Sequence, residues 1–209
     1  MASFDTLVAF AVATAIFAYF PGPALLYTAA QTLARGRRAG LVAALGIHLG
    51  GYAHVAAAAF GLSAIVRHVP ELYLAMKIVG ALYLVWLGFG MLQRRGPAAS
   101  VPDVAPRSAR RAFAESIVVE LLNPKVAVFF IAFLPQFVDP AAALPVWAQF
   151  LILGTIVNLA FSSADLVTVL AASTVLTRLR AGGPGQRLVR IAGGSLLIGL
   201  GVKLATDRS

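Results

Sequence analysis

Six long apolar runs, separated by shorter polar segments, constrain this 209-residue chain more than any other feature of its sequence. The runs cover residues 4–33, 41–66, 72–92, 113–138, 146–176 and 188–204. Each run can cross a hydrocarbon core, which takes about twenty residues of helix. Backbone groups without partners are costly in lipid, so runs that lack polar alternation favour helices over barrel strands. The sequence therefore predicts an all-α integral membrane protein with six transmembrane helices in contact with lipid.

The composition supports this class of protein. Apolar residues make up 60% of the chain and charged residues 12%, and the mean hydropathy of +0.87 is too high for a soluble domain. The absence of cysteine excludes disulfides and thiolate metal ligands. The first residues, MASFDTLVAF, lack the basic region of a signal peptide and the arginines of a transit peptide, so we interpret them as the start of the first span.

The basic residues lie in alternate loops, which predicts how the chain is oriented in the membrane. Arginines cluster after the first, third and fifth runs, whereas the other loops hold few charges. The clusters are Arg35, Arg37 and Arg38; Arg94, Arg95, Arg107, Arg110 and Arg111; and Arg178, Arg180, Arg187 and Arg190. Basic loops stay in the cytoplasm, so both termini are expected outside it. Nucleic-acid binding is disfavoured despite a net charge of +9, because the clusters lack aromatic residues that stack on bases.

Residues 93–112, rich in Pro, Ala and Arg, divide the chain into two three-span halves, 1–92 and 113–209. The last spans of the two halves match: KIVGALYLVWLG begins at Lys77 and RIAGGSLLIGLG begins at Arg190. A repeat with an odd number of spans crosses the membrane in the opposite direction the second time. Inverted repeats of this kind are typical of secondary transporters. We therefore predict two inverted three-helix repeats, joined by a cytoplasmic linker, and transport as the function.

The first helix of each predicted repeat carries a proline break, Pro21-Gly22-Pro23 in one and Asn123-Pro124-Lys125 in the other. Gly or Asn before a proline favours a helix start, because the N–H that proline lacks would have no partner there. At about 1.5 Å per residue from the basic loops, both breaks lie near the middle of the bilayer. The free N–H groups of the two half-helices can converge on one point that suits a carboxylate. Prolines that only kink packed helices are the plainer alternative.

Five ionisable residues are expected to be buried deep in the membrane, where such groups are rare and mark functional sites: His48, His54, Glu120, Lys125 and Asp165. The histidines either are packed, hydrogen-bonded side chains or carry protons. Their spacing of six puts them on different helix faces, which disfavours a shared metal. Glu120 and Lys125 either neutralise each other or hold the ammonium and the carboxylate of a substrate. Asp165 is expected to be protonated or paired across the bundle. The predicted proton-coupling residues are His48, His54, Glu120 and Asp165.

Three segments carry motifs that are specific when found together: FPGPALLYTAAQTLARGRRAGLVAALGIHLGGYAHVAAAAFGLS, KIVGALYLVWLGFGMLQRR and LLNPKVAVFFIAFLPQFVDP. They resemble the LysE/RhtB family of bacterial amino-acid exporters. The resemblance implies an inner-membrane carrier that expels amino acids or similar metabolites and uses the proton motive force. The family's motif residues fall here on Pro21, Gly22, Pro23, Gly46, Asn123, Pro124, Lys125, Pro135 and Gln136.

The partners expected from these arguments are an amino acid or a similar metabolite and protons, and a homodimer is compatible with the sequence. No cofactor or metal is expected. The predicted substrate-binding residues are Pro21, Gly22, Pro23, Tyr27, Asn123, Pro124, Lys125 and Gln136.

Two positions depart from the family pattern. Members often carry an acid in the second span where this chain has Gly51, and Glu120 stands where a neutral residue is expected. The missing acid disfavours lysine or arginine as the substrate and favours a neutral amino acid or a homoserine-like metabolite. Two other functions stay open. Efflux of a metal ion or another small solute is disfavoured by the lack of cysteine and His-rich tracts, and intramembrane catalysis by Glu120, Asp165 and the histidines would need them within hydrogen-bond reach.

Overall fold

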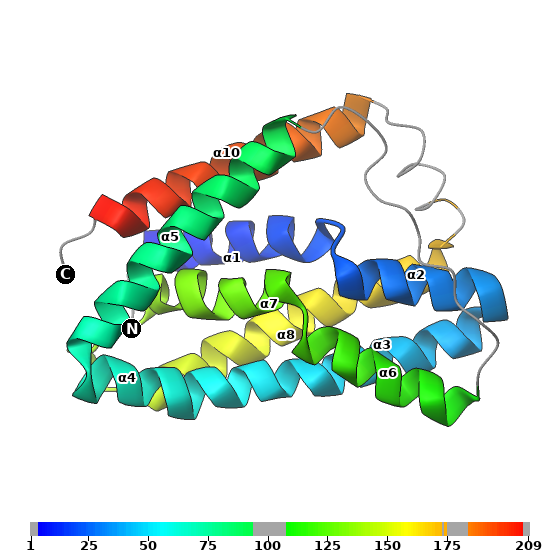
Figure 1. Cartoon of the computed structure of the whole chain (residues 1–209), viewed down its shortest axis with the longest axis horizontal. Helices are drawn as coiled ribbons and strands as arrows, with labels where there is room; N and C mark the ends of the chain where they lie inside the picture. Colours follow the sequence, from blue (N-terminus) through cyan, green and yellow to red (C-terminus); the bar gives the residue numbers. More distant parts are fainter. Residues whose placement is uncertain (1–3, 94–107, 173, 175–183, 207–209) are drawn as a thin grey trace.

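The computed structural model describes residues 4–93, 108–172, 174 and 184–206, and these residues form helices and no strands (Figure 1). In chain order the elements are α1 (Phe4–Tyr19), α2 (Pro23–Arg35), α3 (Arg37–Ala56), η1 (Ala57–Leu62), α4 (Ser63–His68), α5 (Pro70–Gln93), α6 (Ala109–Leu121), α7 (Pro124–Val128), η2 (Phe129–Phe133), η3 (Leu134–Phe137), α8 (Val146–Leu170) and α10 (Pro184–Thr206). η1 and η2 are short π-helical stretches, and η3 is a 3₁₀ turn. The prediction of an all-α protein is confirmed for this part of the chain.

Several of these helices have the length and composition of membrane spans. Among the described residues, Arg37–Ile65, Ala109–Phe137 and Val146–Leu170 are each long and apolar enough, and the bent pair α1 and α2 is a fourth candidate. The chain is therefore a multi-pass membrane protein. Six spans in two inverted repeats stay a prediction. The linker is described only from residue 108 on, where its last residues already belong to α6, and Arg94, Arg95, Arg107, Arg178 and Arg180 lie outside the described residues.

The first predicted break separates α1 from α2, whose axes meet at a bend of 44°. The backbone of Gly22 is extended, with φ −129° and ψ −180°, and Pro23 lies in the first turn of α2. A proline has no N–H to donate and a fixed φ, so it fits the start of one helix and interrupts the helix before it. The expected order of a glycine cap followed by a helix-starting proline is confirmed.

The second break lies between α6 and α7. The side chain of Asn123 accepts a hydrogen bond of 3.1 Å from the backbone N–H of Lys125, and Pro124 lies in the first turn of α7. The expected helix start at Pro124 is confirmed. After Val128 the helix continues through η2 and η3 to Phe137, and the sequence did not predict these π-helical and 3₁₀ stretches.

Most of the helices form a bundle, and the helix pair α5 and α10 packs beside it. α3 packs against α6, α8 and α2, whereas α5 and α10 run side by side and lie over one side of the bundle in Figure 1. Glycine allows the close approach of α5 and α10, because a Cβ atom on Gly88 would lie 2.6 Å from the carbonyl oxygen of Gly194. Likewise, a Cβ atom on Gly201 of α10 would lie 2.7 Å from the carbonyl oxygen of Ala81 in α5.

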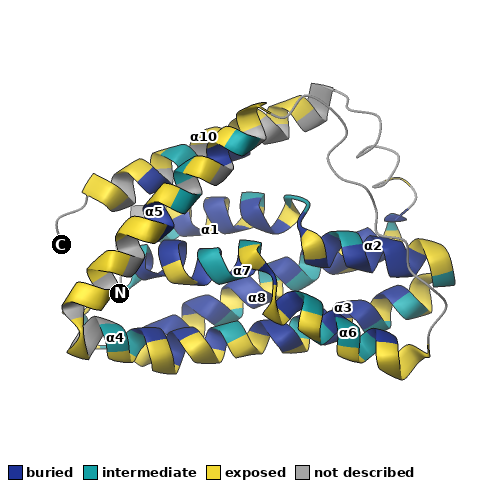
Figure 2. Ribbon diagram, in the orientation of Figure 1, coloured by how far each residue is buried: buried dark blue, intermediate teal, exposed yellow. Residues whose placement is uncertain are grey.

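Phenylalanine rings fill the centre of the bundle. The ring of Phe129 lies 4.8 Å from that of Phe17, 4.4 Å from that of Phe133 and 5.5 Å from that of Phe161, measured between centroids. Figure 2 shows the buried faces of α1, α2, α7 and α8 turned toward one another, with exposed faces on the outer helices. Many of the exposed side chains are large and apolar, such as Leu45 and Trp86. This arrangement suits a bundle surrounded by lipid, because lipid tails are as apolar as leucine.

Candidate functional site

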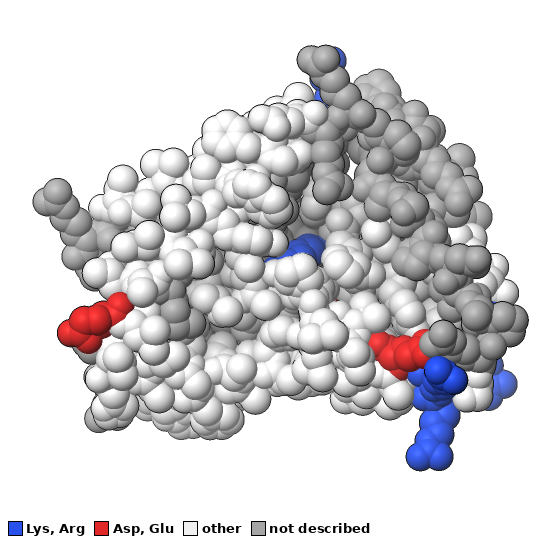
Figure 3. Space-filling view, viewed as in Figure 1, with Lys and Arg blue, Asp and Glu red and all other residues white. Residues whose placement is uncertain are grey.

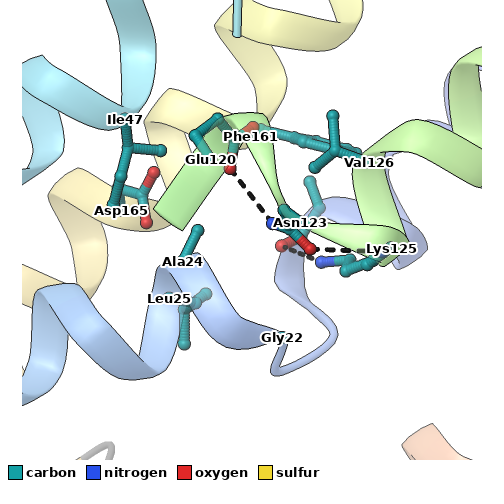
Figure 4. Close-up of a pocket in the computed structure, with 11 residues that line it drawn as sticks. Gly22, Ala24, Leu25, Ile47, Glu120, Asn123, Lys125, Val126, Phe161 and Asp165 are labelled. Atoms are coloured by element: carbon teal, nitrogen blue, oxygen red, sulfur yellow. Dashed lines mark hydrogen bonds between the residues drawn. The ribbon is translucent and has the colours of Figure 1, made fainter. Parts of the chain in front are cut away.

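A small cavity lies where the two helix breaks meet (Figure 4). Gly22 and the first turn of α2 line one side of it, and Asn123 and the first turn of α7 line another. The complete lining is Ala18, Gly22, Ala24, Leu25, Ile47, Glu120, Asn123, Lys125, Val126, Phe161 and Asp165. The space open to the centre of a water molecule is about 20 Å³. This is room for about one water molecule and not for an amino acid.

The ammonium group of Lys125 binds the end of α1. Its Nζ donates a hydrogen bond of 2.7 Å to the carbonyl oxygen of Phe20 and a longer one of 3.5 Å to that of Ala18. Two aromatic rings face the same nitrogen, with centroids 5.2 Å away at Phe17 and 5.1 Å away at Phe161. Figure 3 shows a basic side chain in a hollow at the middle of the viewed face, apart from those near its edges. The ammonium is thus held by carbonyl oxygens and aromatic faces.

The carboxylate of Glu120 is buried beside the second break. Asn123 donates to it from Nδ2 at 3.0 Å, while the Oδ1 of the same amide accepts from the backbone of Lys125. Asn123 therefore ties the end of α6 to the start of α7. For these described residues, no carboxylate oxygen of Glu120 lies within 4.0 Å of the Lys125 ammonium. The direct ion pair considered from the sequence is not formed, because Lys125 turns toward α1.

Asp165 of α8 supplies a second buried carboxylate, with 3% of its surface exposed. Thr28, one turn into α2, donates a hydrogen bond of 3.4 Å from its hydroxyl to Asp165 Oδ1. Figure 4 shows Asp165 beside Ile47, on the same side of the cavity as Glu120. Glu120, Lys125 and Asp165 come from three different elements and converge on one cavity, as ionisable groups inside a membrane bundle tend to do.

The two histidines lie outside the cavity lining. His48 Nδ1 is 2.6 Å from the hydroxyl of Ser162, which donates its own hydrogen to the carbonyl oxygen of Asn158 at 2.8 Å. Since a serine hydroxyl has one hydrogen, His48 donates from Nδ1. His54 donates from Nε2 to the backbone oxygen of Glu120 at 2.9 Å. Both histidines therefore join helices through hydrogen bonds, which is the structural alternative considered from the sequence.

Two predicted substrate-binding residues also lie apart from the cavity lining. The hydroxyl of Tyr27 accepts from Gln31 Nε2 at 2.9 Å and is within 3.2 Å of the carbonyl oxygen of Ala112, to which it donates. Gln136 donates to the carbonyl oxygen of Ala132 at 3.1 Å, within its own helix. Of the predicted substrate-binding set, Gly22, Asn123 and Lys125 line the cavity, with Pro21, Pro23 and Pro124 next to them in the chain.

Sequence reasoning missed Phe17, Phe161 and Thr28. The phenylalanines stand in apolar runs where any large side chain would fit, so only their position around the Lys125 ammonium distinguishes them. The spacing of Thr28 from the first break was a usable signal, because a hydroxyl shortly after a mid-membrane helix start can face the same point as the break.

We predict that replacing Asn123 with Ala destabilises the protein by about 1–3 kcal/mol, because α7 loses its cap and the buried carboxylate of Glu120 loses its donor. The measurement is the thermal unfolding midpoint of the purified protein in detergent. Asn123→Asp keeps the oxygen that caps α7, but it places a second acceptor beside the Glu120 carboxylate. We therefore expect its unfolding midpoint to be no higher than that of Asn123→Ala. A midpoint equal to that of the unchanged protein for Asn123→Ala would contradict the bridging role.

Comparison with known proteins relates the chain to a family of translocators. The family model described as LysE type translocator matches residues 15–208. An uncharacterised membrane protein of Pseudomonas aeruginosa is 34% identical in an alignment of 198 positions that covers 89% of this chain and 88% of that protein. A leucine efflux protein of Klebsiella pneumoniae is 29% identical over 198 residues, 90% and 89% of the two chains. A homoserine/homoserine lactone efflux protein of Salmonella typhimurium is 31% identical in an alignment of 212 positions that covers 99% of this chain and 98% of that protein. No solved structure matches significantly.

Proposed function

The chain belongs to the LysE family of translocators, and from this premise we propose that it exports amino acids or closely related small metabolites across the bacterial inner membrane. The observation that carries the proposal is the cavity between the two helix breaks, lined by one ammonium and two carboxylate groups. A zwitterion needs partners of both charges, and a cavity of this kind supplies them. The relatives named for leucine and homoserine efflux favour a neutral amino acid, in line with the glycine at position 51.

The start of α2 is the proposed site for the substrate carboxylate. The first intrahelical hydrogen bond of α2 runs from Leu26 to the carbonyl oxygen of Gly22. The N–H groups of Ala24 and Leu25 come before it, and no side chain caps this helix start. Both residues line the cavity. Free N–H groups and the positive end of the helix dipole favour a carboxylate here, and Asn123 at the start of α7 is the expected second contact.

Asp165 is the proposed carrier of the coupling proton. An ionised carboxylate buried without a cation is costly, so the group holds a proton until a cation comes near. Substrate binding from the cytoplasm that moves an ammonium group toward Asp165 then releases the proton there. Substrate release outside allows Asp165 to take up a proton again, and the cycle is an antiport. Glu120 lines the same cavity and is the second candidate, whereas proton-coupling roles for His48 and His54 find no support in their hydrogen bonds.

The small cavity fits a stage of such a cycle in which no substrate is bound. A cavity with room for about one water molecule has to widen toward one side of the membrane before an amino acid enters. Six spans in two inverted repeats would provide the two opposite openings. Basic side chains gather near the ends of α2, α3 and α6 in Figure 3, which supports a cytoplasmic location for that end and termini on the other side. A homodimer stays a prediction.

The test of this function is counterflow in membrane vesicles that contain the purified protein. The vesicles are loaded with an unlabelled amino acid, and entry of the same labelled amino acid is followed for leucine, homoserine, threonine and lysine, with and without a pH gradient. We expect exchange of at least one neutral amino acid and a response to the gradient. Exchange of no amino acid, together with movement of a divalent metal ion, would favour the metal-efflux alternative. Among the described residues, no group of three His, Asp or Glu is arranged to hold a metal ion.

A further inference from the structure

The Lys125 ammonium is held by carbonyl oxygens and aromatic rings, both of which bind alkylammonium groups. Its hydrogen-bond acceptors are the carbonyl oxygens of Phe20, at 2.7 Å, and Ala18, at 3.5 Å. Ala18 belongs to the last turn of α1 and Phe20 directly follows this helix. The last carbonyl groups of a helix have no intrahelical donor, and the helix dipole is negative there. The rings of Phe17 and Phe161 face the same nitrogen at 5.2 and 5.1 Å, within the distance of cation–π attraction. All four partners belong to α1, α8 and the chain after α1, and not to α7, which carries Lys125, so we expect them to remain when the lysine is replaced.

The site lies beside the proposed carboxylate site. Ala18, Gly22, Ala24 and Phe161 line the same cavity, so the carbonyl end of α1 and the N–H end of α2 face one space. The break at Pro21-Gly22-Pro23 thus exposes acceptors on one side and donors on the other, and only these three residues lie between Phe20 and Ala24. An α-amino acid carries its ammonium and carboxylate on one carbon atom. Its two charged groups match the two exposed helix ends.

We propose that the carbonyl oxygens of Ala18 and Phe20, with the rings of Phe17 and Phe161, bind the α-ammonium group of the transported amino acid, and that Lys125 fills this site when no substrate is present. The inference rests on the proposed export function and adds the ammonium subsite to it. Lys125 then competes with the substrate's ammonium group for this subsite. In the protein without substrate, the Lys125 ammonium supplies a donor to these part-buried carbonyl oxygens.

Displacement of Lys125 has a destination within the same cavity. Glu120 and Asp165 line its wall, and the first is on α6 while the second is on α8. An ammonium group that leaves the end of α1 finds these carboxylates as its next partners. Substrate arrival therefore moves one positive charge toward the carboxylates, which links the ammonium subsite to the release of the coupling proton.

The test replaces the tethered ammonium with a free one. Lys125→Ala removes Cγ, Cδ, Cε and Nζ, and n-propylammonium has the same three carbons and one nitrogen. We expect propylammonium chloride to raise the unfolding midpoint of purified Lys125→Ala in a saturable manner, whereas potassium chloride of the same ionic strength and 1-propanol do not. Lys125→Met is the matched control, because its side chain fills the space without a charge. Unchanged protein and Lys125→Met should show no saturable response.

A second pair of variants tests the aromatic faces. Adding Phe17→Leu to Lys125→Ala removes one ring, and we expect propylammonium to bind about tenfold more weakly as a result. Phe10→Leu is the control, because Phe10 packs against Phe133 and Phe137 and has no contact with the ammonium. If Lys125→Ala elutes as an aggregate, the same loss is measured for leucine and homoserine binding to Phe17→Leu and Phe161→Leu with the lysine retained.

The outcomes separate this inference from the export function. A folded Lys125→Ala protein that gains no stability from propylammonium overturns the ammonium site, even if amino acids are transported. Saturable stabilisation together with competition by the transported amino acid, and none by its deaminated analogue, supports the full proposal. Saturable stabilisation in a protein that exchanges no amino acid retains the ammonium site and overturns the export function with its substrate.

Discussion

Replacing Asp165 with Asn is expected to abolish the response of transport to a pH gradient. Asparagine keeps the size of the side chain and can accept the hydrogen bond from Thr28, but it cannot exchange a proton. One proton moving down a gradient of about one pH unit supplies about 1.4 kcal/mol, which drives a solute gradient of about tenfold. We therefore expect the unchanged protein to build up a substrate gradient of about tenfold per exchanged proton. With Asp165→Asn, the substrate concentrations on the two sides of the vesicle membrane should only become equal. Vesicles with an imposed pH gradient provide the measurement.

Two controls make this result specific to the cavity. Glu71→Gln removes a carboxylate at the exposed start of α5, so its coupling should equal that of the unchanged protein. Glu120→Gln removes the other carboxylate of the cavity and distinguishes the two candidates. Counterflow without a gradient should persist in Asp165→Asn, which shows that the protein is inserted and binds its substrate. An undiminished response to the gradient in Asp165→Asn would exclude this residue from the proton path.

The local structure of the two breaks could be predicted from the sequence. Each break depends on a residue that limits its own backbone: Pro23 and Pro124 cannot donate an intrahelical hydrogen bond, and Gly22 and Asn123 favour the cap position before them. No long-range contact is needed for this result. The presence of Glu120, Lys125 and Asp165 in apolar runs was equally informative, because such groups are too costly in lipid to lie there by chance.

The partners of these groups could not be predicted in the same way. Lys125 lies five residues after Glu120 in the chain, yet it binds the end of α1, which is more than one hundred residues away. The choice depends on how the helices pack, and packing also decides that Phe17 and Phe161 face the ammonium. The roles of His48 and His54 stay a prediction. Their type suggested proton transfer, while the structure shows them in hydrogen bonds between helices.

Replacing Pro21, Gly22 and Pro23 with Ala is expected to leave membrane insertion intact and to reduce transport to the background. A continuous helix would pair the N–H of Ala24 with the carbonyl oxygen of Phe20, four residues earlier. This one hydrogen bond removes a donor from the proposed carboxylate site and the main acceptor of the Lys125 ammonium. A Cβ atom at position 22 would also lie 2.7 Å from Lys125 Cδ, so the lysine has to move. The apolar run still spans the bilayer, which is why insertion should persist.

Three measurements check this expectation: the amount of the variant protein in the membrane, its elution profile in detergent and its counterflow activity. Pro140→Ala, in an exposed loop before α8, is the matched control for loss of a proline and should transport normally. Gly22→Ala alone separates the two effects, because it crowds Lys125 while both prolines and the bend are retained. If the triple variant is inserted and still exchanges amino acids at the original rate, the exposed helix ends do not bind the substrate. Their function would then be limited to fitting α1 and α2 around the aromatic core.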